Sequence, residues 1–537
     1  MTNQHTKFAF IFLAIVILTG SYLRLANLGS MSFWVDEVNH VATAESLLDG
    51  KGPVLPSNRL YDRSILFTYL VSASFSLFGV SEAAARLPAA LFGILTIPLI
   101  YIIATTIWRH AAYGLAAAAL YAVHPFMVGW ARECRMYTMF QFFFLIGIYG
   151  LYLGLESTGK HTARQKKASG FIRKLITQWR LDLRWLGISF VALLVATSLH
   201  ILSGVVFPPL MLYVLFMFVV TVYRSRRLTL EHSKYFVIFI SGLFLAGAAV
   251  LLSPYLYDEL KAALSFAPAW AKYKSAQDTL YYLRFLSKPF FLSTFLLFLA
   301  GTFWFAIQQS KALFFLWLQF VIPVVLMSLF FVLHVERYIF HLYPLYLIIA
   351  AGGLVALVKL AAQKIPVSEP VILISGLLLF LLASPWFRFA IKIPNLTHGY
   401  NGAVMHLEWR DAAFYTKSAA SGQEPILTTL PLMVRHYVGR ADYFLLNLAF
   451  PREGEVVATN GSLYDYYSNA RVIGTLDELQ AVLNRHQKAW VVVDDYRFSR
   501  QQYIPSDIRD FIKTSMKVAY QTPAKTVSVY AWEEPTR

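Results

Sequence analysis

The sequence predicts a polytopic α-helical membrane protein that carries a soluble α/β domain at its C-terminal end. Of the 537 residues, 57% are hydrophobic and only 14% are charged, whereas soluble chains carry about 25% charged residues. Apolar runs long enough to cross a bilayer recur up to about residue 390, and shorter apolar runs separated by polar residues follow. We therefore expect a transmembrane domain over 1–390 and an extracytoplasmic α/β domain over 391–537.

The apolar runs give the number of expected spans. A helix crosses a hydrocarbon core of about 30 Å with roughly 20 apolar residues, and by this measure the sequence predicts about 11 transmembrane helices. The expected spans are 8–28, 87–107, 111–130, 136–155, 185–200, 204–223, 235–256, 289–308, 312–333, 340–360 and 371–387. We take the first run as a retained span, because it is too long for the apolar part of a typical signal peptide.

The basic residues indicate an orientation. The net charge is +17, but the basic residues gather in short loops between apolar runs, as the positive-inside rule describes, so no nucleic-acid partner is predicted. The short run at 64–80 is expected to be interfacial or re-entrant, since Arg109 and the basic loops at 156–184 and 224–227 then all face the cytoplasm. The segments expected outside are 29–86, 131–135, 257–288, 334–339 and the C-terminal domain.

The first candidate for chemistry is the acidic pair Asp36-Glu37, just beyond the first expected span. Asp36 is expected to cap a helix from Glu37 to Leu48, with Gly50 at its C-terminal end. A helix cap is one interpretation of Asp36. A general base is the other, because a carboxylate at a membrane surface has its pKa tuned by desolvation and by cationic neighbours.

The second candidate is the segment with Arg132 and Arg135. Their spacing of three is expected to place them on one helical face, with Glu133 and Tyr137 together on another. Interface anchoring is one interpretation of these residues. Phosphate binding is the other, since guanidinium groups grip phosphate bidentately and outward arginines run against the positive-inside pattern.

A third group precedes the span at 340–360 and contains His334, Glu336, Arg337 and Tyr338. Charges at a membrane edge are costly and tend to mark function, although Glu336 and Arg337 can also simply pair with each other. His334 and His341 form only a weak metal signal, and the single cysteine, Cys134, excludes an internal disulfide and a Cys-based metal site. No metal site is predicted.

Further polar groups lie in the expected outer loops. Arg59 and Arg63 in the first loop are candidates for substrate binding, as is Tyr137. The loop 257–288 mixes lysines with aromatic residues, which suits either an anionic lipid headgroup or helices lying on the bilayer.

The C-terminal part alternates strand and helix signals, which favours an α/β domain. We expect strands at 425–430, 489–494 and 527–531, and amphipathic helices at 408–420, 476–486 and 506–516. No glycine-rich phosphate-binding motif is present there, so no nucleotide site is predicted.

The markers, taken in order, resemble the GT-C membrane glycosyltransferases, and most closely the group with protein O-mannosyltransferases and lipid A aminoarabinose transferases (families 39 and 83). The resemblance covers most of 1–390. It is carried by Asp36-Glu37, the run Phe78–Pro88, His124-Pro125 followed by Arg132 and Arg135, and Glu336-Arg337-Tyr338 before Tyr343-Pro344.

The resemblance implies a sugar donor carried on a polyprenyl phosphate and transfer outside the cytoplasm, as in a bacterial plasma membrane. It carries the role of base to Asp36, with Glu37 beside it, and the role of phosphate binding to Arg132, Arg135 and Arg337. The acceptor is a hydroxyl on a lipid, a protein or a glycan. No cofactor is required, because no Asp-x-Asp motif is present, although a divalent cation is compatible with the site.

Two other classes fit the composition. A transporter would show repeated halves or broken spans with charges at the midplane, whereas here the charges gather at the outer ends of the expected helices. A non-catalytic receptor with a C-terminal binding domain would leave the acidic pair and the arginines unexplained. The sequence leaves open which sugar moves and which acceptor receives it.

Overall fold

A computed structural model describes residues 2–156, 178–225, 230–252, 278–331, 334–363, 369–450 and 455–534. Most of the basic loop at 156–184 and of the loop at 257–288 falls outside the described residues. The chain divides into two compact units. The helical unit comprises Met1–Gly20, Phe92–His124 and Tyr137–Phe389, and the α/β unit comprises Ser21–Leu91, Pro125–Met136 and Ala390–Arg537. The functional division at about residue 390 stays a prediction.

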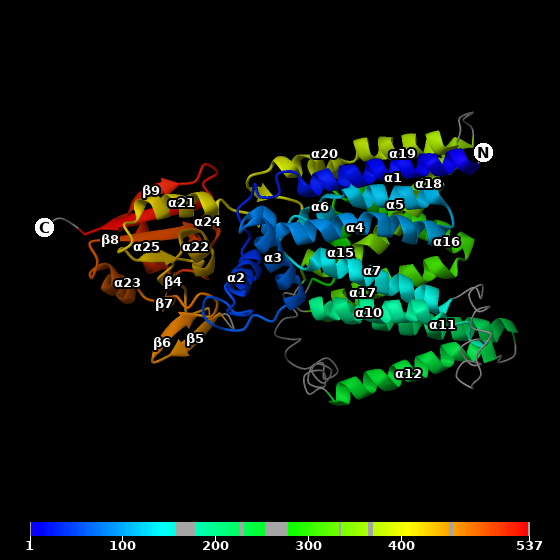
Figure 1. Cartoon of the computed structure of the whole chain (residues 1–537), viewed down its shortest axis with the longest axis horizontal. Helices are drawn as coiled ribbons and strands as arrows, with labels where there is room; N and C mark the ends of the chain where they lie inside the picture. Colours follow the sequence, from blue (N-terminus) through cyan, green and yellow to red (C-terminus); the bar gives the residue numbers. More distant parts are fainter. Residues whose placement is uncertain are drawn as a thin grey trace. The chain divides into compact units, whose positions relative to one another are not determined.

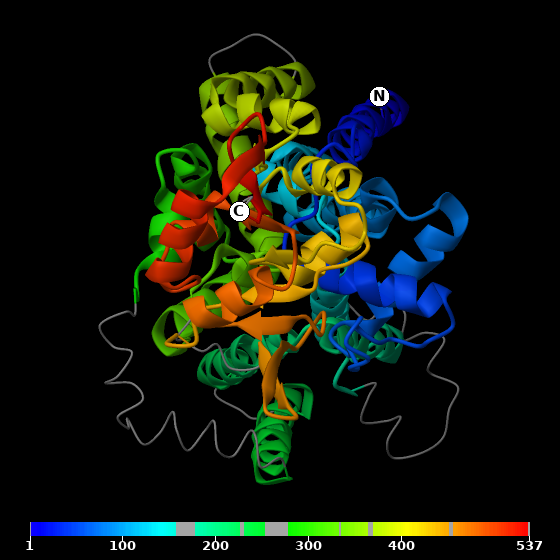
Figure 2. The same ribbon diagram turned by 90° about the vertical axis from the view of Figure 1, so that its left-hand side faces the viewer.

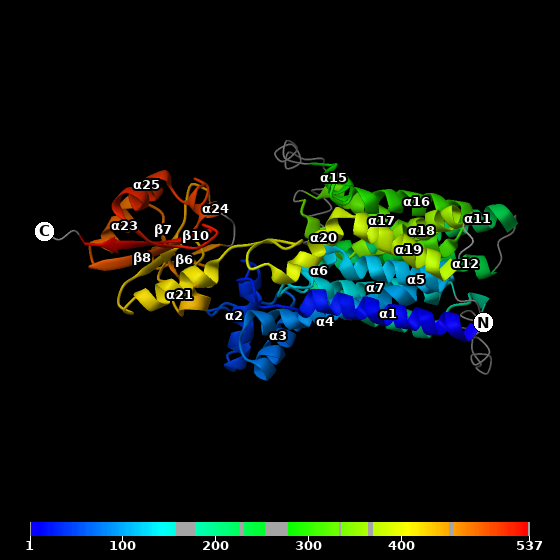
Figure 3. The same ribbon diagram turned by 90° about the horizontal axis from the view of Figure 1, so that it is seen from above.

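The helical unit consists of long helices that lie side by side with roughly aligned axes (Figures 1 and 3). Its helices are α5 (Ala111–Val123), α7 (Tyr137–Leu155), α10 (Leu183–Leu199), η1 (Ile201–Val206), α11 (Phe207–Ser225), α12 (Leu230–Leu252), α15 (Tyr281–Ser287), α16 (Leu292–Gln308), α17 (Lys311–Phe330), η2 (Glu336–Ile339), α18 (Tyr343–Ala362) and α19 (Glu369–Ala383). Helices α1 (Thr2–Leu25), α4 (Glu82–Trp108) and α20 (Pro385–Lys392) contribute residues to both units.

Among the described residues, six helices are long and apolar enough to cross a membrane, and two bent pairs raise the number to eight. The six are Lys7–Leu25, Glu82–Trp108, Tyr137–Leu155, Ile201–Arg224, Lys311–Phe330 and Tyr343–Ala362; the pairs join Tyr281–Ser287 to Leu292–Gln308 and Val371–Ala383 to Pro385–Asn395. Shorter apolar helices at Ala111–Val123, Leu183–Leu199 and Ser233–Leu245 coincide with the remaining expected spans. The chain is an integral membrane protein of the predicted helical class.

Two expected spans, 111–130 and 371–387, are interrupted before a proline, and the first break leads into the site. The run at 111–130 was expected to be continuous, but α5 ends at Val123 and a short helix, α6 (Pro125–Trp130), begins after it. Proline disfavours the helical conformation for the residue before it, and His124 is accordingly extended, with φ −70° and ψ 124°. The break therefore follows from Pro125.

Glycines let two helices of the helical unit approach closely. A Cβ atom at Gly301 of α16 would lie 2.0 Å from the main-chain oxygen of Ile349 in α18. A Cβ atom at Gly353 of α18 would lie 2.1 Å from the main-chain oxygen of Leu297. Small residues at such contacts are typical of packed membrane helices.

The α/β unit is built on an eight-stranded mixed sheet of order β5-β6-β7-β4-β3-β8-β10-β9. The strands are β3 (Ile426–Thr428), β4 (Tyr443–Leu445), β5 (Val456–Thr459), β6 (Ser462–Asp465), β7 (Arg471–Ile473), β8 (Lys488–Asp494), β9 (Lys517–Gln521) and β10 (Val527–Glu533). The four central strands β7, β4, β3 and β8 are parallel, and the outer pairs are antiparallel. The β5–β6 hairpin projects from one edge (Figure 2).

Helices cover both faces of this sheet. In the views of Figures 1 and 3, α23 (Leu476–Leu483) and α25 (Ser506–Ser515) lie on one face and α21 (Trp409–Ala419) on the other. Val491 and Val493 of β8 face the first pair in one apolar core, while Trp490 contacts Tyr415 of α21. Helices α22 (Pro431–Val438) and α24 (Asp495–Phe498) complete the domain. The three strands and three helices expected in the tail are confirmed.

The α/β unit also contains the first polar loop of the chain. Helix α2 (Glu37–Leu48) has the expected bounds and packs against α3 (Ile65–Phe78), the run expected to be interfacial. At its C-terminal end Gly50 takes a φ of +72°. The Gly50 amide donates a hydrogen bond to the carbonyl of Leu47, and the Lys51 amide donates to that of Ser46. This is a common way for a helix to end, and it favours glycine. A small hairpin, β1 (Gly399–Tyr400) with β2 (Met405–His406), precedes α21.

Replacing Gly301 by alanine is expected to lower the stability of the helical unit, because the new methyl group must push α16 away from α18. Overpacking of this kind costs about 1–3 kcal/mol. The melting temperature of the purified protein in detergent measures it. As a matched control, a Cβ atom at Gly187 in α10 meets nothing within 4 Å, so Gly187→Ala leaves stability unchanged or raises it. Equal melting temperatures for the two variants would contradict the packing described here.

Candidate active site

A buried ion pair between Glu37 and Arg86 lies at the centre of the polar residues in the α/β unit. Arg86 Nε and Nη2 donate to the two carboxylate oxygens of Glu37, both at 2.8 Å. The main-chain amides of Cys134 and Trp34 donate to the same two oxygens, at 2.6 and 2.7 Å. The Glu37 side chain is fully buried and that of Arg86 is 2% exposed. Four donors thus saturate the Glu37 carboxylate.

The same guanidinium also holds the loop between α1 and α2. Arg86 Nη1 donates to the carbonyls of Leu28 and Met31, at 3.2 and 2.9 Å, and Nη2 donates to the carbonyl of Ser32 at 3.1 Å. Arginine's planar fork of donors suits such multiple contacts. Arg86 therefore joins the start of α4 to the acidic loop.

The charge of Arg86 decides the ionisation of Glu37. Burial alone raises the pKa of a carboxyl group, but the adjacent Arg86 guanidinium and the hydrogen bond from the Cys134 amide outweigh burial. The pKa of Glu37 is lowered below its ordinary value, so Glu37 is ionised at neutral pH. A carboxylate that is buried, paired and saturated is unsuited to taking a substrate proton.

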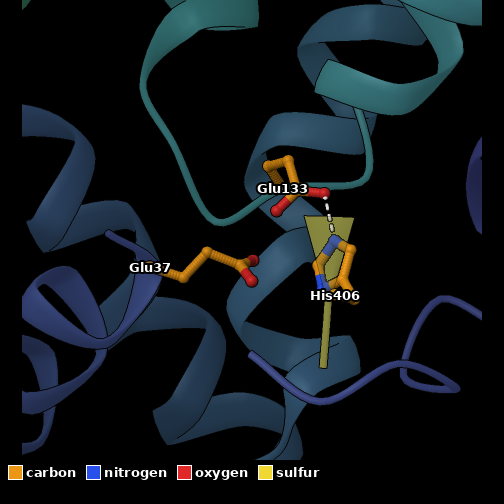
Figure 4. A group of neighbouring side chains, drawn as sticks. All are labelled: Glu37, Glu133 and His406. Atoms are coloured by element: carbon orange, nitrogen blue, oxygen red, sulfur yellow. Dashed lines mark hydrogen bonds and ion pairs between the residues drawn. The ribbon is translucent and has the colours of Figure 1, made fainter. Parts of the chain in front are cut away.

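A second acidic residue, Glu133, lies beside this pair and contacts the hairpin that precedes α21 (Figure 4). Its Oε1 atom accepts from Asn401 Nδ2 at 2.6 Å and lies 2.8 Å from His406 Nε2. His406 Nδ1 lies 2.8 Å from the carbonyl of Ser32, so this nitrogen carries a proton. Burial, with the negative charge of Glu37 adding to it, raises the pKa of Glu133. The Glu133–His406 contact is therefore a buried hydrogen bond between Glu133 Oε1 and His406 Nε2.

A metal site is one possible interpretation of Glu37, Glu133 and His406, because each offers an atom that could bind a metal ion. One ligand atom from each lies within 4.8 Å of the others, and all three side chains are buried (Figure 4). However, both Glu37 oxygens already accept two hydrogen bonds each, and the Arg86 guanidinium occupies the position next to them. Arg86 provides the positive charge that a cation would bring, so the set does not fit a resident metal.

Asp36 differs from its neighbour Glu37 in exposure. It occupies the N-cap position of α2, as expected, but its side chain makes no capping hydrogen bond. The interpretation of Asp36 as an ordinary side-chain cap is therefore wrong. Asp36 is half-buried and lines a cavity of about 210 Å³ within the α/β unit. Of the acidic pair, Asp36 is thus the residue that lines this cavity.

Arg132 and Arg135 lie in the turn that follows α6, not on a helix, because the helix ends at Trp130. The expected shared helical faces of Arg132 with Arg135 and of Glu133 with Tyr137 are therefore wrong. Arg132 donates to the carbonyls of Leu23, Arg24, Ala26 and Asn27 at 2.8–3.2 Å. These contacts satisfy carbonyls at the end of α1, which gives Arg132 a structural role.

Arg135 lies closer to the acidic pair. Its Nη1 atom donates to the main-chain carbonyl of Asp36 at 2.8 Å, and its side chain is 9% exposed. The guanidinium charge also lowers the pKa of His40, beyond the larger effect of burial. Arg135 thus places positive charge beside the backbone of Asp36.

The remaining arginines of the first loop lie near tyrosines of the α/β unit. The Arg59 guanidinium lies 5.0 Å from the centre of the Tyr466 ring, in a cation–π contact. Burial raises the pKa of Tyr467, one of the cavity-lining residues, and the positive charge of Arg63 opposes that rise. Their roles in substrate binding stay predictions.

The other predicted site residues belong to the helical unit. Tyr137 is buried near the ring of His200, and Glu336 lies 3.8 Å from Lys288 Nζ. His334 stacks on Tyr281. Arg337 and Tyr338 lie on η2. These residues belong to the helical unit, whereas the acidic pair belongs to the α/β unit. Their roles stay predictions.

Sequence reasoning missed Arg86, Glu133, Asn401 and His406 as members of the site. Arg86 was part of the family-like run Phe78–Pro88 and Glu133 stood between two candidate arginines, so a signal existed for both. Asn401 and His406 lie just after the membrane part of the chain, where no local pattern distinguishes them.

Comparisons with solved structures show that this chain has a GT-C fold. The structure is similar to that of ArnT from Cupriavidus metallidurans, with 15% identity over 98% of both chains and a TM-score of 0.56; the same enzyme bound to undecaprenyl phosphate gives 0.53. It is also similar to the archaeal oligosaccharyltransferase AglB from Archaeoglobus fulgidus, with 12% identity, a TM-score of 0.55 and coverage of 98% of this chain and 74% of AglB.

Sequence comparisons point to the same group. Residues 62–223 match the family described as dolichyl-phosphate-mannose-protein mannosyltransferase. A segment of 155 residues is 22% identical to the undecaprenyl phosphate-alpha-4-amino-4-deoxy-L-arabinose arabinosyl transferase of Pseudomonas paraeruginosa. The Pseudomonas aeruginosa enzyme of the same name is 21% identical. The matched segment covers only 28% of this chain and 28% of each relative.

Replacing Glu37 by glutamine is expected to destabilise the protein strongly, because Arg86 is then left buried without its counter-charge. Breaking a buried pair in this way costs about 3–5 kcal/mol, which thermal unfolding in detergent measures at pH 7. Because the pKa of Glu37 is lowered in the folded state, this stabilisation is present above the ordinary carboxyl pKa and is lost as the pH falls through the folded value. The difference between wild type and variant therefore shrinks on acidification.

Glu45 of the same helix provides the control. It is partly exposed and lies 3.2 Å from His436 Nδ1, so Glu45→Gln is expected to cost less than about 1 kcal/mol. A Glu37→Gln variant as stable as Glu45→Gln at pH 7 would show that the ion pair does not hold the unit together.

Proposed function

We propose that the chain is a glycosyltransferase that moves a sugar from a polyprenyl-phosphate donor to a hydroxyl group of a lipid, protein or glycan acceptor. The GT-C fold over almost the whole chain supports this class. The observation that carries the proposal is the difference in environment between the two residues of the acidic pair. Glu37 is saturated by Arg86 and two amides, whereas Asp36 lines a cavity.

In the proposed reaction, Asp36 is the general base. It takes the proton of the acceptor hydroxyl as the oxygen attacks the anomeric carbon of the donor sugar. The bond between that carbon and the phosphate oxygen breaks, and polyprenyl phosphate leaves from the opposite side, which inverts the configuration. General-base catalysis by a positioned carboxylate contributes about 10²–10⁴-fold to the rate.

Positive charge near the leaving phosphate lowers the barrier, because the charge of the phosphate grows in the transition state. Arg135 is the arginine of the α/β unit that supports this role best, since it lies beside the Asp36 backbone. Arg132 is occupied by four carbonyls, which favours a structural role. Arg337 is retained as a third predicted phosphate ligand.

The proposal includes a location. We infer an active site and a C-terminal domain on the outer side of a bacterial inner membrane, with the N-terminus in the cytoplasm. The support is the positive-inside distribution of basic residues in the sequence. The comparisons give no support to the transporter and receptor classes.

Replacing Asp36 by asparagine is expected to reduce sugar transfer by about a hundredfold or more, since the base is lost, without a change in melting temperature. The assay incubates the purified protein with a polyprenyl-phosphate sugar and measures release of polyprenyl phosphate. Asp49→Asn is the matched control, because Asp49 caps the C-terminal end of the same helix and pairs with the exposed Lys51. Transfer by Asp36→Asn at the rate of Asp49→Asn would remove the base from the mechanism.

The two arginines of the turn are expected to respond differently. Arg135→Gln lowers transfer by about tenfold or more, because it removes positive charge beside the acidic pair. Arg132→Gln mainly lowers the melting temperature, since four carbonyls lose their donor. Transfer rates normalised to the folded fraction separate the effects. Normalised rates that fall only in Arg132→Gln would reverse the assignment.

A further inference from the structure

The β1–β2 hairpin lies directly against the short helix α6. A Cβ atom at Gly129 of α6 would lie 2.7 Å from the amide nitrogen of Ala403 and 2.8 Å from the carbonyl oxygen of Asn401. A Cβ atom at Gly402, whose φ is +98°, would lie 2.5 Å from the carbonyl oxygen of Pro125. Glycine is the residue that permits such a close approach of two main chains. The two glycines therefore let the hairpin pack onto α6.

Two side chains of the hairpin also contact the turn that follows α6, through the buried carboxylate of Glu133. Asn401 Nδ2 donates to Glu133 Oε1 at 2.6 Å, and His406 Nε2 lies 2.8 Å from the same oxygen (Figure 4). His406 Nδ1 lies 2.8 Å from the carbonyl oxygen of Ser32. Asn401 Oδ1 accepts from two main-chain amides of the hairpin, so its side chain is held in one orientation. The hairpin is thus joined to the turn by side chains as well as by main-chain packing.

The residues after Glu133 in the same turn contact the acidic pair. The amide of Cys134 donates to Glu37 Oε1 at 2.6 Å, and Arg135 Nη1 donates to the carbonyl of Asp36 at 2.8 Å. The amide of Arg135 also bonds the carbonyl of Glu133 at 2.7 Å, so the main chain between these two residues is tightly folded. A shift of Glu133 therefore shifts Arg135. Misplacing a reacting group by 1 Å can cost about a hundredfold in rate.

The environment of Glu133 is costly for a contact that only joins two segments. Its side chain is fully buried, and within the part of the chain that the structure describes its Oε2 atom has no hydrogen-bond partner. Burial and the charge of Glu37 raise its pKa. Ionisable groups perturbed in this way are frequent at functional sites. The arrangement therefore favours a role in the reaction over a role in stability alone.

We infer that Asn401 and His406 are positioning residues of the sugar transfer, because they hold Glu133 and with it the turn that places Arg135 against the Asp36 main chain. The inference rests on the proposed function, which assigns the reaction to Asp36 and Arg135. It gives the β1–β2 hairpin a task in that reaction. The hairpin acts on the rate through the turn, without touching the donor or the acceptor.

Two substitutions of His406 separate its two contacts. The side-chain nitrogen of glutamine reaches the position of Nε2, and that of asparagine reaches the position of Nδ1. His406→Gln therefore keeps the contact with Glu133, whereas His406→Asn keeps only the contact with the Ser32 carbonyl. His398→Asn is the matched control, because His398 directly precedes β1, is exposed and lies 3.8 Å from Glu408.

The first measurement is amide hydrogen exchange of the purified full-length protein in detergent, with no donor or acceptor present. His406→Asn speeds exchange of the amides in 131–136 by about tenfold or more, because the turn loses a contact that keeps it closed. His406→Gln and His398→Asn exchange within about twofold of wild type. Wild-type exchange of this turn in His406→Asn overturns the inference. Because no substrate is used, that result is distinguishable from a failure of the proposed sugar transfer.

The second measurement is the rate of sugar transfer, normalised to the folded fraction. His406→Asn lowers kcat by about tenfold with little change in the KM for the donor, since Arg135 acts on charge that grows in the transition state. His406→Gln retains the rate within about threefold, as a rescue by the conservative variant. In an Arg135→Gln background, His406→Asn has less than about a twofold effect, because the group that it positions is gone.

A merely structural role of His406 gives a different pattern. The loss in normalised rate would then be the same in the wild-type and Arg135→Gln backgrounds, since the two residues would act independently. Equal losses in the two backgrounds, or a loss in His406→Gln as large as that in His406→Asn, overturn the inference.

Discussion

The buried contact between Glu37 and Arg86 is the constraint on which the rest of the candidate site depends. It joins the first residue of α2, the first turn of α4 and the loop between α1 and α2, and Glu37 also accepts from the turn after α6. Burying two charges is costly, and a pair of this kind stabilises a fold only when its remaining hydrogen-bonding groups are satisfied. Here the carbonyls and amides around the pair meet that condition.

The pair also determines which neighbouring groups are available for chemistry. Because Glu37 is saturated, the negative charge that remains near the cavity at the start of α2 is that of Asp36. Glu133, His406 and Asn401 extend the network into the β1–β2 hairpin. Arg410 of α21 also donates to Glu82 of α4 and to the carbonyls of Gly29 and Ser30. The sheet domain and the first polar loop are therefore parts of a single unit, which explains how the sheet can supply walls to a cavity at Asp36.

Local patterns were sufficient to predict the class of fold and many of its elements. The bounds of α2 were predicted correctly because the acidic start and the glycine stop act within a few residues. The strands β3, β8 and β10 were predicted from short apolar runs. Strand β8 has the most continuous of these runs because it is buried on both faces. The interruption at Pro125 was overlooked, although its cause is local, because the apolar run continues through it.

The contacts of the site depend on residues distant in sequence, and these could not be predicted. Asp36 and Glu37 look equivalent in sequence, and only the position of Arg86 shows which of them is saturated. Arg132 and Arg135 were placed on a helix by their spacing, but the chain leaves the helix before them. His406 carries no local signal, since its partners Glu133 and Ser32 belong to other segments.

We expect Asp36 and Arg135 to face the reacting end of a polyprenyl-phosphate donor. A structure of the purified protein with bound undecaprenyl phosphate will show where the phosphate binds. The phosphate is expected to contact the Arg135 guanidinium, next to Asp36. A phosphate bound away from both residues, with Asp36 covered by protein, would show that they do not form the donor site.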